Sequence, residues 1–198
     1  MLAGGFHHDR QFMIIDAATN RFITQREHPN MSLIETQLSN DALTVVIPKG
    51  GSFVVPFSYG DADGVRREVV VWKSTCTAID MGDAVADGLS SYLGQAVRLV
   101  KMDPTFRRSL NPVFALAPTD YTDFADGMPL LLCSSASLTA ASAQAKSDLT
   151  MLRFRPNIIV SNEVAWEEDT WAEVQIGDAT LHLVKPCTRC QVWSLFHI

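Results

Sequence analysis

Short apolar runs separated by polar connectors fill the first part of the chain. Such runs occupy residues 12–16, 22–25, 32–37, 42–47, 52–57 and 68–72. Runs of this length that are rich in β-branched and aromatic residues predict strands, and the first two predict a hairpin. We therefore expect a β meander that either closes into a barrel or stacks as a sandwich.

The spacing of apolar residues becomes helical after residue 80. Five residues recur at the interval of one helix face: Ala84, Val85, Leu89, Tyr92 and Leu93. Gly94 follows them and supplies a C-terminal stop for the helix. Residues 97–101 then return to the strand pattern.

The second half of the chain is more irregular. Prolines at positions 104, 112 and 118 interrupt residues 103–123, for which we expect a long loop of the kind that often carries function. Strands are predicted at 129–133, 158–160 and 179–184, a helix at 134–146, and a strand with a tight turn at 174–179. The predicted fold is a mixed, β-rich α+β fold, with one module over residues 1–100 and a second over residues 101–198.

Composition narrows the class of protein. The chain has 198 residues, of which 47% are hydrophobic and 19% charged, values that fit a folded protein. A net charge of −6 argues against binding of duplex nucleic acid, which needs a basic surface, but leaves room for a small anionic ligand. No apolar run approaches the ~20 residues that span a bilayer. Four cysteines without a secretory leader indicate reduced intracellular thiols, and the compartment, cytoplasmic or mitochondrial, stays open.

The richest chemistry lies in residues 184–190, Val-Lys-Pro-Cys-Thr-Arg-Cys. Arg189 directly precedes Cys190 and favours its thiolate, the form that binds metals and attacks electrophiles. Pro186 cannot donate to a sheet ladder and ends the preceding strand, so Cys187 and Cys190 are expected at a strand end. Plain buried thiols remain an alternative, as does a zinc site, which would need two more ligands besides the cysteines, with His182 nearby.

Other residues allow more than one interpretation. Arg107-Arg108 fits either a solvated loop or an attraction for an anionic substrate or an acidic electron donor. Asp169 fits a turn or cap better than an acid catalyst. Arg10 and Arg155 could form ordinary surface ion pairs, although Arg155 stands before a proline and a strand that we expect to be buried, which favours a ligand. Cys76 and Cys133 are expected to be core thiols, and the His7-His8 pair to be exposed near the terminus.

Several motifs, taken in order, resemble a known family. Three motifs resemble the N-terminal β-barrel module that precedes a MOSC domain (molybdenum cofactor sulfurase C-terminal domain): Asp9-Arg10-Gln11-Phe12-Met13, Thr24-Gln25-Arg26 and the block Trp72…Cys76…Asp80…Gly82-Asp83. Five later motifs resemble the MOSC domain itself: Phe124-Ala125-Asp126-Gly127-Met128-Pro129, Arg153-Phe154-Arg155-Pro156-Asn157, Glu168-Asp169-Thr170-Trp171, Ile176-Gly177-Asp178 and Lys185-Pro186-Cys187-Thr188-Arg189-Cys190. The pattern is most similar to the mitochondrial amidoxime-reducing component and its bacterial relatives. By the same resemblance, the MOSC β-barrel is expected to be incomplete, with peripheral helices and both ends of the family pattern missing.

The resemblance implies a molybdenum-pyranopterin cofactor. The metal ligand of the family falls on Cys190, and soft thiolate ligation suits that metal. The cofactor contacts of the family fall on Arg10, Gly127, Met128, Arg155, Asn157, Thr188 and Arg189, of which Gly127 and Met128 offer only backbone groups. Arginine forks onto phosphate through two donors. Cys187 is then expected to support the site without binding the metal.

The resemblance also implies a reaction and partners. The family reduces N-hydroxylated substrates by two electrons, which come from cytochrome b5 and its reductase or from a fused iron–sulfur module that is not seen in this sequence. Two other possibilities stay open: a non-catalytic carrier of the cofactor or of sulfur, and an inactive fragment. MOSC domains are also described as binding pyridoxal phosphate, but no lysine context supports a Schiff base here, and Lys185 is only a candidate cation.

Overall fold

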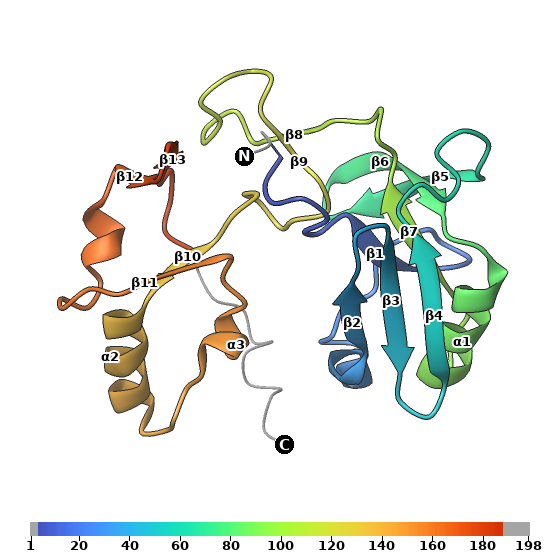
Figure 1. The fold of residues 1–198 in the computed structure, drawn as a ribbon, viewed down its shortest axis with the longest axis horizontal. Helices are drawn as coiled ribbons and strands as arrows, with labels where there is room; N and C mark the ends of the chain where they lie inside the picture. Colours follow the sequence, from blue (N-terminus) through green and yellow to red (C-terminus); the bar gives the residue numbers. More distant parts are fainter. Residues whose placement is uncertain (1–3, 188–198) are drawn as a thin grey trace. The chain divides into compact units, whose positions relative to one another are not determined.

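The computed structural model describes residues 4–187, which form two compact units. The N-terminal unit comprises residues 8–108 and 123–126, and the C-terminal unit comprises residues 4–7, 109–122 and 127–187 of the described chain (Figure 1). Strands outnumber helices, so the β-rich α+β class predicted from the sequence is confirmed. The module boundary between residues 100 and 101 stays a prediction.

Two antiparallel sheets build the N-terminal unit. The first has the order β1-β7-β6-β5 and the second the order β2-β3-β4. Their bounds are β1 (Phe12–Asp16), β2 (Glu35–Leu38), β3 (Ala42–Ile47), β4 (Gly51–Pro56), β5 (Arg66–Val71), β6 (Ser74–Asp80) and β7 (Val97–Met102). Because β7 lies between β1 and β6, only the second sheet keeps the meander order that the sequence predicted.

The hairpin predicted between residues 12–16 and 22–25 is present only in reduced form. An antiparallel bridge joins Ile15 to Phe22, with the Ile23 amide donating to the Ile14 carbonyl at 3.1 Å. The long partner of β1 is β7, which pairs with it along its whole length, with Ile14 opposite Leu99. The strand predicted at 32–37 also begins later, because Pro29 opens the 3-10 helix η1 (Pro29–Leu33).

Helix α1 (Asp83–Leu93) covers the core of the N-terminal unit. It buries Val85, Ala86, Leu89 and Leu93 and packs against β3, β4 and β7 (Figure 1). Gly94 ends it with φ 69°, in the left-handed region that glycine adopts without strain. The predicted helix is confirmed, except that Ala84 is exposed and Ala86 takes its place on the buried face.

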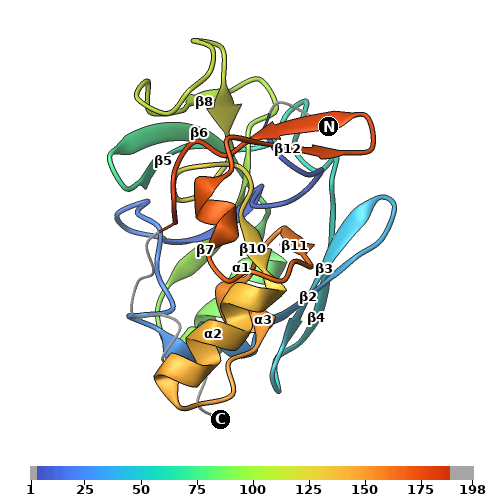
Figure 2. The same cartoon turned by 90° about the vertical axis from the view of Figure 1, so that its left-hand side faces the viewer.

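The C-terminal unit is made of short elements. These are β8 (Arg108–Ser109), whose first residue belongs to the N-terminal unit, β9 (Tyr121–Thr122), β10 (Leu132–Ser134), α2 (Ser135–Ala145), α3 (Met151–Phe154), β11 (Ile158–Val160), η2 (Glu167–Thr170), β12 (Glu173–Ile176) and β13 (Ala179–His182). The strands form the pairs β8–β9, β10–β11 and β12–β13. The pair β10–β11 is parallel, and α2 and α3 supply the crossover that a parallel pair needs (Figure 2).

Ser134 links β10 to α2. Its Oγ accepts a hydrogen bond from the Ser137 amide at 3.2 Å, which caps the helix, and lies 2.5 Å from Asn162 Oδ1. Across residues 4–187, no helix is both long enough and apolar enough to cross a membrane.

Candidate functional site

The structure describes five of the eight residues predicted to bind cofactor or metal. Gly127, Met128, Arg155 and Asn157 lie in the C-terminal unit, and Arg10 lies in the N-terminal unit. The other three, Thr188, Arg189 and Cys190, lie outside the described residues.

Lys185 lies beside the backbone of Gly127. A Cβ added to Gly127 would stand 3.4 Å from the Nζ of Lys185, so the Lys185 ammonium lies directly beside the Gly127 backbone. The same Nζ lies 4.9 Å from the ring centroid of Phe114, within the range of a cation–π interaction. The sequence offered Lys185 only as a candidate cation and gave no signal for Phe114, which lies in the long loop predicted at 103–123.

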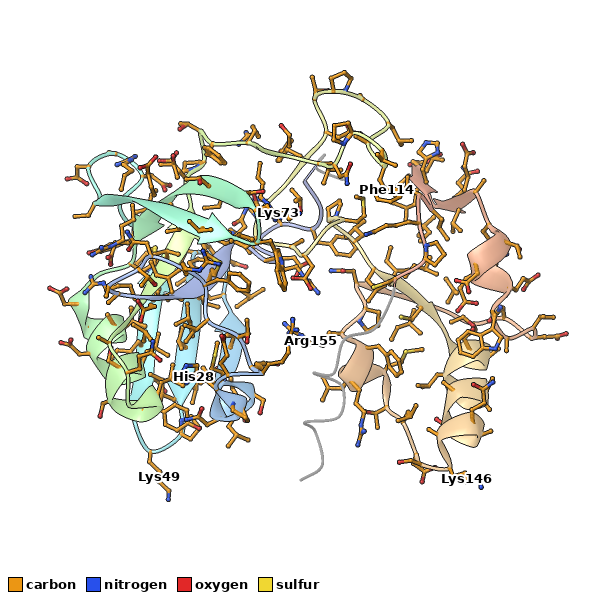
Figure 3. The ribbon with its side chains drawn as sticks, turned by 180° about the vertical axis from the view of Figure 1, so that it is seen from behind. His28, Lys49, Lys73, Phe114, Lys146 and Arg155 are labelled. Atoms are coloured by element: carbon orange, nitrogen blue, oxygen red, sulfur yellow. The ribbon has the colours of Figure 1, made fainter. Side chains whose placement is uncertain are left out.

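Arg155 ends the short helix α3. Its backbone is left-handed, with φ 50°, and its amide donates to the carbonyl of Met151 at 3.1 Å. The side chain is exposed (Figure 3). The expectation that Arg155 precedes a buried strand is wrong, because Ile159 in the centre of β11 is 57% exposed; β11 has a single neighbour, β10, in a two-stranded sheet.

Asn157 ties the start of β11 to the start of β10. Its Oδ1 accepts from the Leu131 amide at 3.0 Å, and its own amide donates to the Leu131 carbonyl at 2.8 Å. The side-chain oxygen of Asn157 is therefore used within the unit, where it fixes the start of β11 against β10.

Arg10 stands in a strained stretch before β1. Its φ is 53°, and its Nη1 lies 2.5 Å from both carboxylate oxygens of Asp9. The alternative of a surface ion pair is thus present, and an anion would have to compete with Asp9 for the guanidinium. His7 is exposed, as expected, whereas His8 stacks on Phe57 with ring centroids 3.6 Å apart.

Arg108 is not part of a solvated loop. Its residue exposure is 9%, and its Nη1 donates to the carbonyls of Asp123 and Ala125 at 3.0 and 2.5 Å. Arg107 differs, since its Nη1 donates to the carbonyls of Pro104 and Phe106 at exposed positions. The two arginines therefore do not form a common anion-binding pair, and Arg108 has a structural role that the sequence did not predict.

Asp123 is held beside these arginines. Burial raises the pKa of its carboxyl group, the hydrogen bond from Gln11 and the charge of Arg107 lower it, and the charge of Asp9 raises it again, with a net upward shift. Its neighbour Phe124 packs against the buried cluster that contains Cys76 and Val100.

The described cysteines differ in exposure. Cys76 is 1% exposed, and burial raises the pKa of its thiol, with a smaller lowering by the charge of Arg108. It is the core thiol that the sequence predicted, whereas Cys133 is only half-buried and Cys187 is exposed. A raised pKa disfavours the thiolate, so Cys76 is a poor ligand and nucleophile.

Alternative metal sites find no support among residues 4–187. No group of three or more His, Cys, Asp or Glu side chains in this part of the chain is placed to hold a metal ion. His182 lies on β13 with its Nδ1 3.0 Å from Glu173 on β12, so it is engaged across that hairpin. Asp169 lies in the single turn η2, in agreement with a turn role.

Two family descriptions match the chain. The MOSC N-terminal beta barrel domain matches residues 1–96, and the MOSC domain matches residues 120–196. The chain belongs to the MOSC family. The second match includes the Lys-Pro-Cys-Thr-Arg-Cys motif and all four predicted cofactor-binding residues described in the C-terminal unit.

Curated relatives cover nearly all of this MOSC chain. Mitochondrial amidoxime-reducing component 1 of Homo sapiens is 30% identical over 192 residues, which are 96% of this chain and 56% of that protein. Mitochondrial amidoxime reducing component 2 of Rattus norvegicus is 32% identical over 92% of this chain and 55% of its own length. The molybdenum cofactor sulfurase of Drosophila erecta is 30% identical over 95% of this chain and 23% of its own length. The chain thus spans about half the length of the amidoxime-reducing relatives.

Proposed function

We propose that this MOSC chain binds a molybdenum-pyranopterin cofactor and uses it to reduce N-hydroxylated substrates by two electrons. The observation that supports the proposal is the approach of Lys185, from the Lys-Pro-Cys-Thr-Arg-Cys motif, to the backbone of Gly127. Relatives named for amidoxime reduction match this chain over nearly its whole length.

The described residues include groups that suit an anionic ligand. The Lys185 ammonium lies beside the Gly127 backbone. Arg155 is an exposed residue, and its guanidinium suits a terminal phosphate because it offers two parallel donors. Asn157 and Met128 would add the further contacts that the family resemblance implies, those of Met128 through its backbone.

The remaining contacts fall on residues outside the described part. The thiolate of Cys190 would bind the metal, with Arg189 favouring its ionised form. Thr188 would donate its hydroxyl to the cofactor. Arg10 would bind the cofactor in place of Asp9, with which it forms an ion pair in this structure.

In this account the cofactor and the protein divide the work. When bound, the molybdenum cofactor supplies the two-electron chemistry. Lys185 and Arg155 hold its negative charge, and Asn157 orients β11 through its bonds to Leu131. Electrons would come from an external donor such as cytochrome b5 and its reductase, the partners that the resemblance implies.

A charge-removal series tests the proposal. Lys185→Gln is expected to lower the reduction of an aromatic amidoxime, assayed with a reconstituted electron donor, by about tenfold, because one desolvated charge contact is worth roughly 1.4 kcal/mol. Lys146→Gln removes another exposed cation, at the C-terminal cap of α2, and is expected to leave the rate unchanged. Equal rates in the two variants would count against the Lys185 contact, and no reduction by the wild type would refute the enzyme function.

A second candidate is a non-catalytic carrier of the cofactor or of sulfur. The match to a molybdenum cofactor sulfurase favours it. A carrier would retain molybdenum and pterin without reducing the amidoxime, so the same assay, combined with cofactor analysis, separates the two functions.

A further inference from the structure

We propose that Trp72 and Arg108 are positioning residues for the turn at Gly127–Met128, because they hold the four preceding residues on the N-terminal unit. We call these four residues, 123–126, the clamped segment. The inference rests on the proposed function, which assigns Gly127 and Met128 to the cofactor.

The clamped segment belongs to the N-terminal unit, although the residues on both sides of it belong to the C-terminal unit. Arg108 donates from one nitrogen to two of its carbonyls, those of Asp123 and Ala125. The amide of Phe124 donates to the carbonyl of Arg10 at 2.9 Å, and Ala125 is only 3% exposed. Backbone and side chains of the segment are therefore both fixed.

Trp72 holds the last residue of the segment. Its indole Nε1 donates to Asp126 Oδ1 at 3.1 Å. The indole ring packs against Phe22, with centroids 4.9 Å apart, and the guanidinium carbon of Arg26 lies 5.9 Å from its centroid. These two neighbours fix the direction in which the indole N–H points, although Trp72 is 43% exposed.

The backbone of Trp72 adopts a strained conformation in this arrangement. Trp72 and Lys73 form the two-residue turn between β5 and β6, and Trp72 has φ 53°. Two-residue hairpin turns place glycine or asparagine at such positions, because a large side chain disfavours positive φ. A bulky residue that persists in a strained conformation indicates a role, and the bond to Asp126 supplies one.

The consequence for Gly127 follows from chain continuity. Asp126 is the residue directly before it, so fixing Asp126 restricts the backbone that presents the Gly127 and Met128 groups to a ligand. A turn that is ordered before the ligand arrives loses less conformational entropy on binding. The N-terminal unit would thus contribute to cofactor affinity without contacting the cofactor through Trp72 or Arg108.

Hydrogen exchange of the full chain without added cofactor is the first test. Trp72→Phe keeps an aromatic ring against Phe22 but removes the donor, and is expected to speed exchange at the amides of Gly127 and Met128 about tenfold. Asp126→Ala removes the acceptor and should speed exchange by the same factor. The double variant Trp72→Phe with Asp126→Ala should exchange no faster than either single variant, because both changes remove the same hydrogen bond. Asp126→Asn should keep exchange close to the wild-type rate, because its Oδ1 still accepts the bond. Trp166→Phe, at a tryptophan with 44% exposure outside the clamp, serves as the control.

Release of cofactor from the loaded chain is the second test. Trp72→Phe and Asp126→Ala should each release molybdenum and pterin about tenfold faster than wild type, with Asp126→Asn and Trp166→Phe close to wild type. If Trp72→Phe fails to fold, Asp126→Ala gives the same information from the other partner. Unchanged exchange at residues 127–128, or faster exchange with unchanged release, would overturn the proposal. A wild-type chain that carries no cofactor would overturn the proposed function instead. The hydrogen-exchange test alone would then decide whether the bond between Trp72 and Asp126 orders the turn at Gly127–Met128.

Discussion

At the scale of single residues, buried charges organise the N-terminal unit. The side chain of Asp80 is 3% exposed and accepts hydrogen bonds from Arg98, Arg67 and the Gly82 amide. Burial raises the pKa of Asp80, but the bonds from Arg98, from the Gly82 amide and from Arg67 outweigh it, and the net shift is downward. The carboxylate therefore stays charged in the folded chain and joins β6, β5 and β7.

Asp80→Asn is expected to lower the free energy of unfolding by about 3 kcal/mol, because it leaves two arginines without their buried partner. Asp83→Asn removes an exposed partner of the same Arg98, at 85% side-chain exposure, and should cost less than about 1 kcal/mol. Urea unfolding of both variants measures the difference. Equal losses would contradict the assignment of a stabilising role to the buried carboxylate.

The same carboxylate sets a pH dependence. Because the pKa of Asp80 is lowered in the folded state, its contribution is complete above the unfolded pKa of about 3.9 and is lost as the pH falls through the lower folded value. The stability gap between wild type and Asp80→Asn should thus be full at pH 7 and shrink below about pH 4. A gap that grows on acidification would contradict the downward shift.

At the scale of elements, regular patterns were predictable and unusual turns were not. The helix at residues 83–93, its stop at Gly94 and the strand at 42–47 follow from apolar spacing and one glycine. The strand β6 went unrecognised because the turn before it, Trp72–Lys73, contains no glycine, proline or asparagine. The pairing of β1 with β7 could not be predicted from the sequence either, since 80 residues separate the two strands along the chain.

Gly94→Ala tests the end of α1. A Cβ at this position would meet no atom within 4 Å, but the left-handed φ of 69° is strained for any residue other than glycine. Backbone strain alone should therefore lower the free energy of unfolding of Gly94→Ala by about 1 kcal/mol. Gly94→Asn should lose less stability, because asparagine tolerates this conformation. Thermal or urea unfolding gives both values, and an Ala variant as stable as wild type would contradict the strain.

At the scale of the whole molecule, apolar burial is concentrated in one unit. Every fully buried apolar side chain of residues 4–187 lies in the N-terminal unit. In the C-terminal unit, apolar residues such as Leu152, Ile159 and Val164 are more than half exposed. The N-terminal unit therefore has the large apolar core, and the C-terminal unit, which carries the motif residues, has less apolar packing of its own.

The candidate site was predictable only in part from the sequence. The motif at residues 185–190 and the arginine before a proline at 155–156 carry chemistry that residue types reveal. The approach of Lys185 to Gly127 and Phe114 was not predictable, because it joins segments far apart in the chain. Trp72 acts through one hydrogen bond to a distant segment and Arg108 through two, and such contacts leave no local sequence pattern.

The molybdenum and pterin content of the purified chain tests the central claim most directly. Wild type should carry both groups in near-equal amounts to protein, Cys190→Ser should lose the metal, and Cys187→Ser should keep it. Cys187 is a matched control, since it lies in the same motif and is exposed. Absence of molybdenum and pterin from the wild type, or equal metal content in all three proteins, would contradict cofactor binding through Cys190.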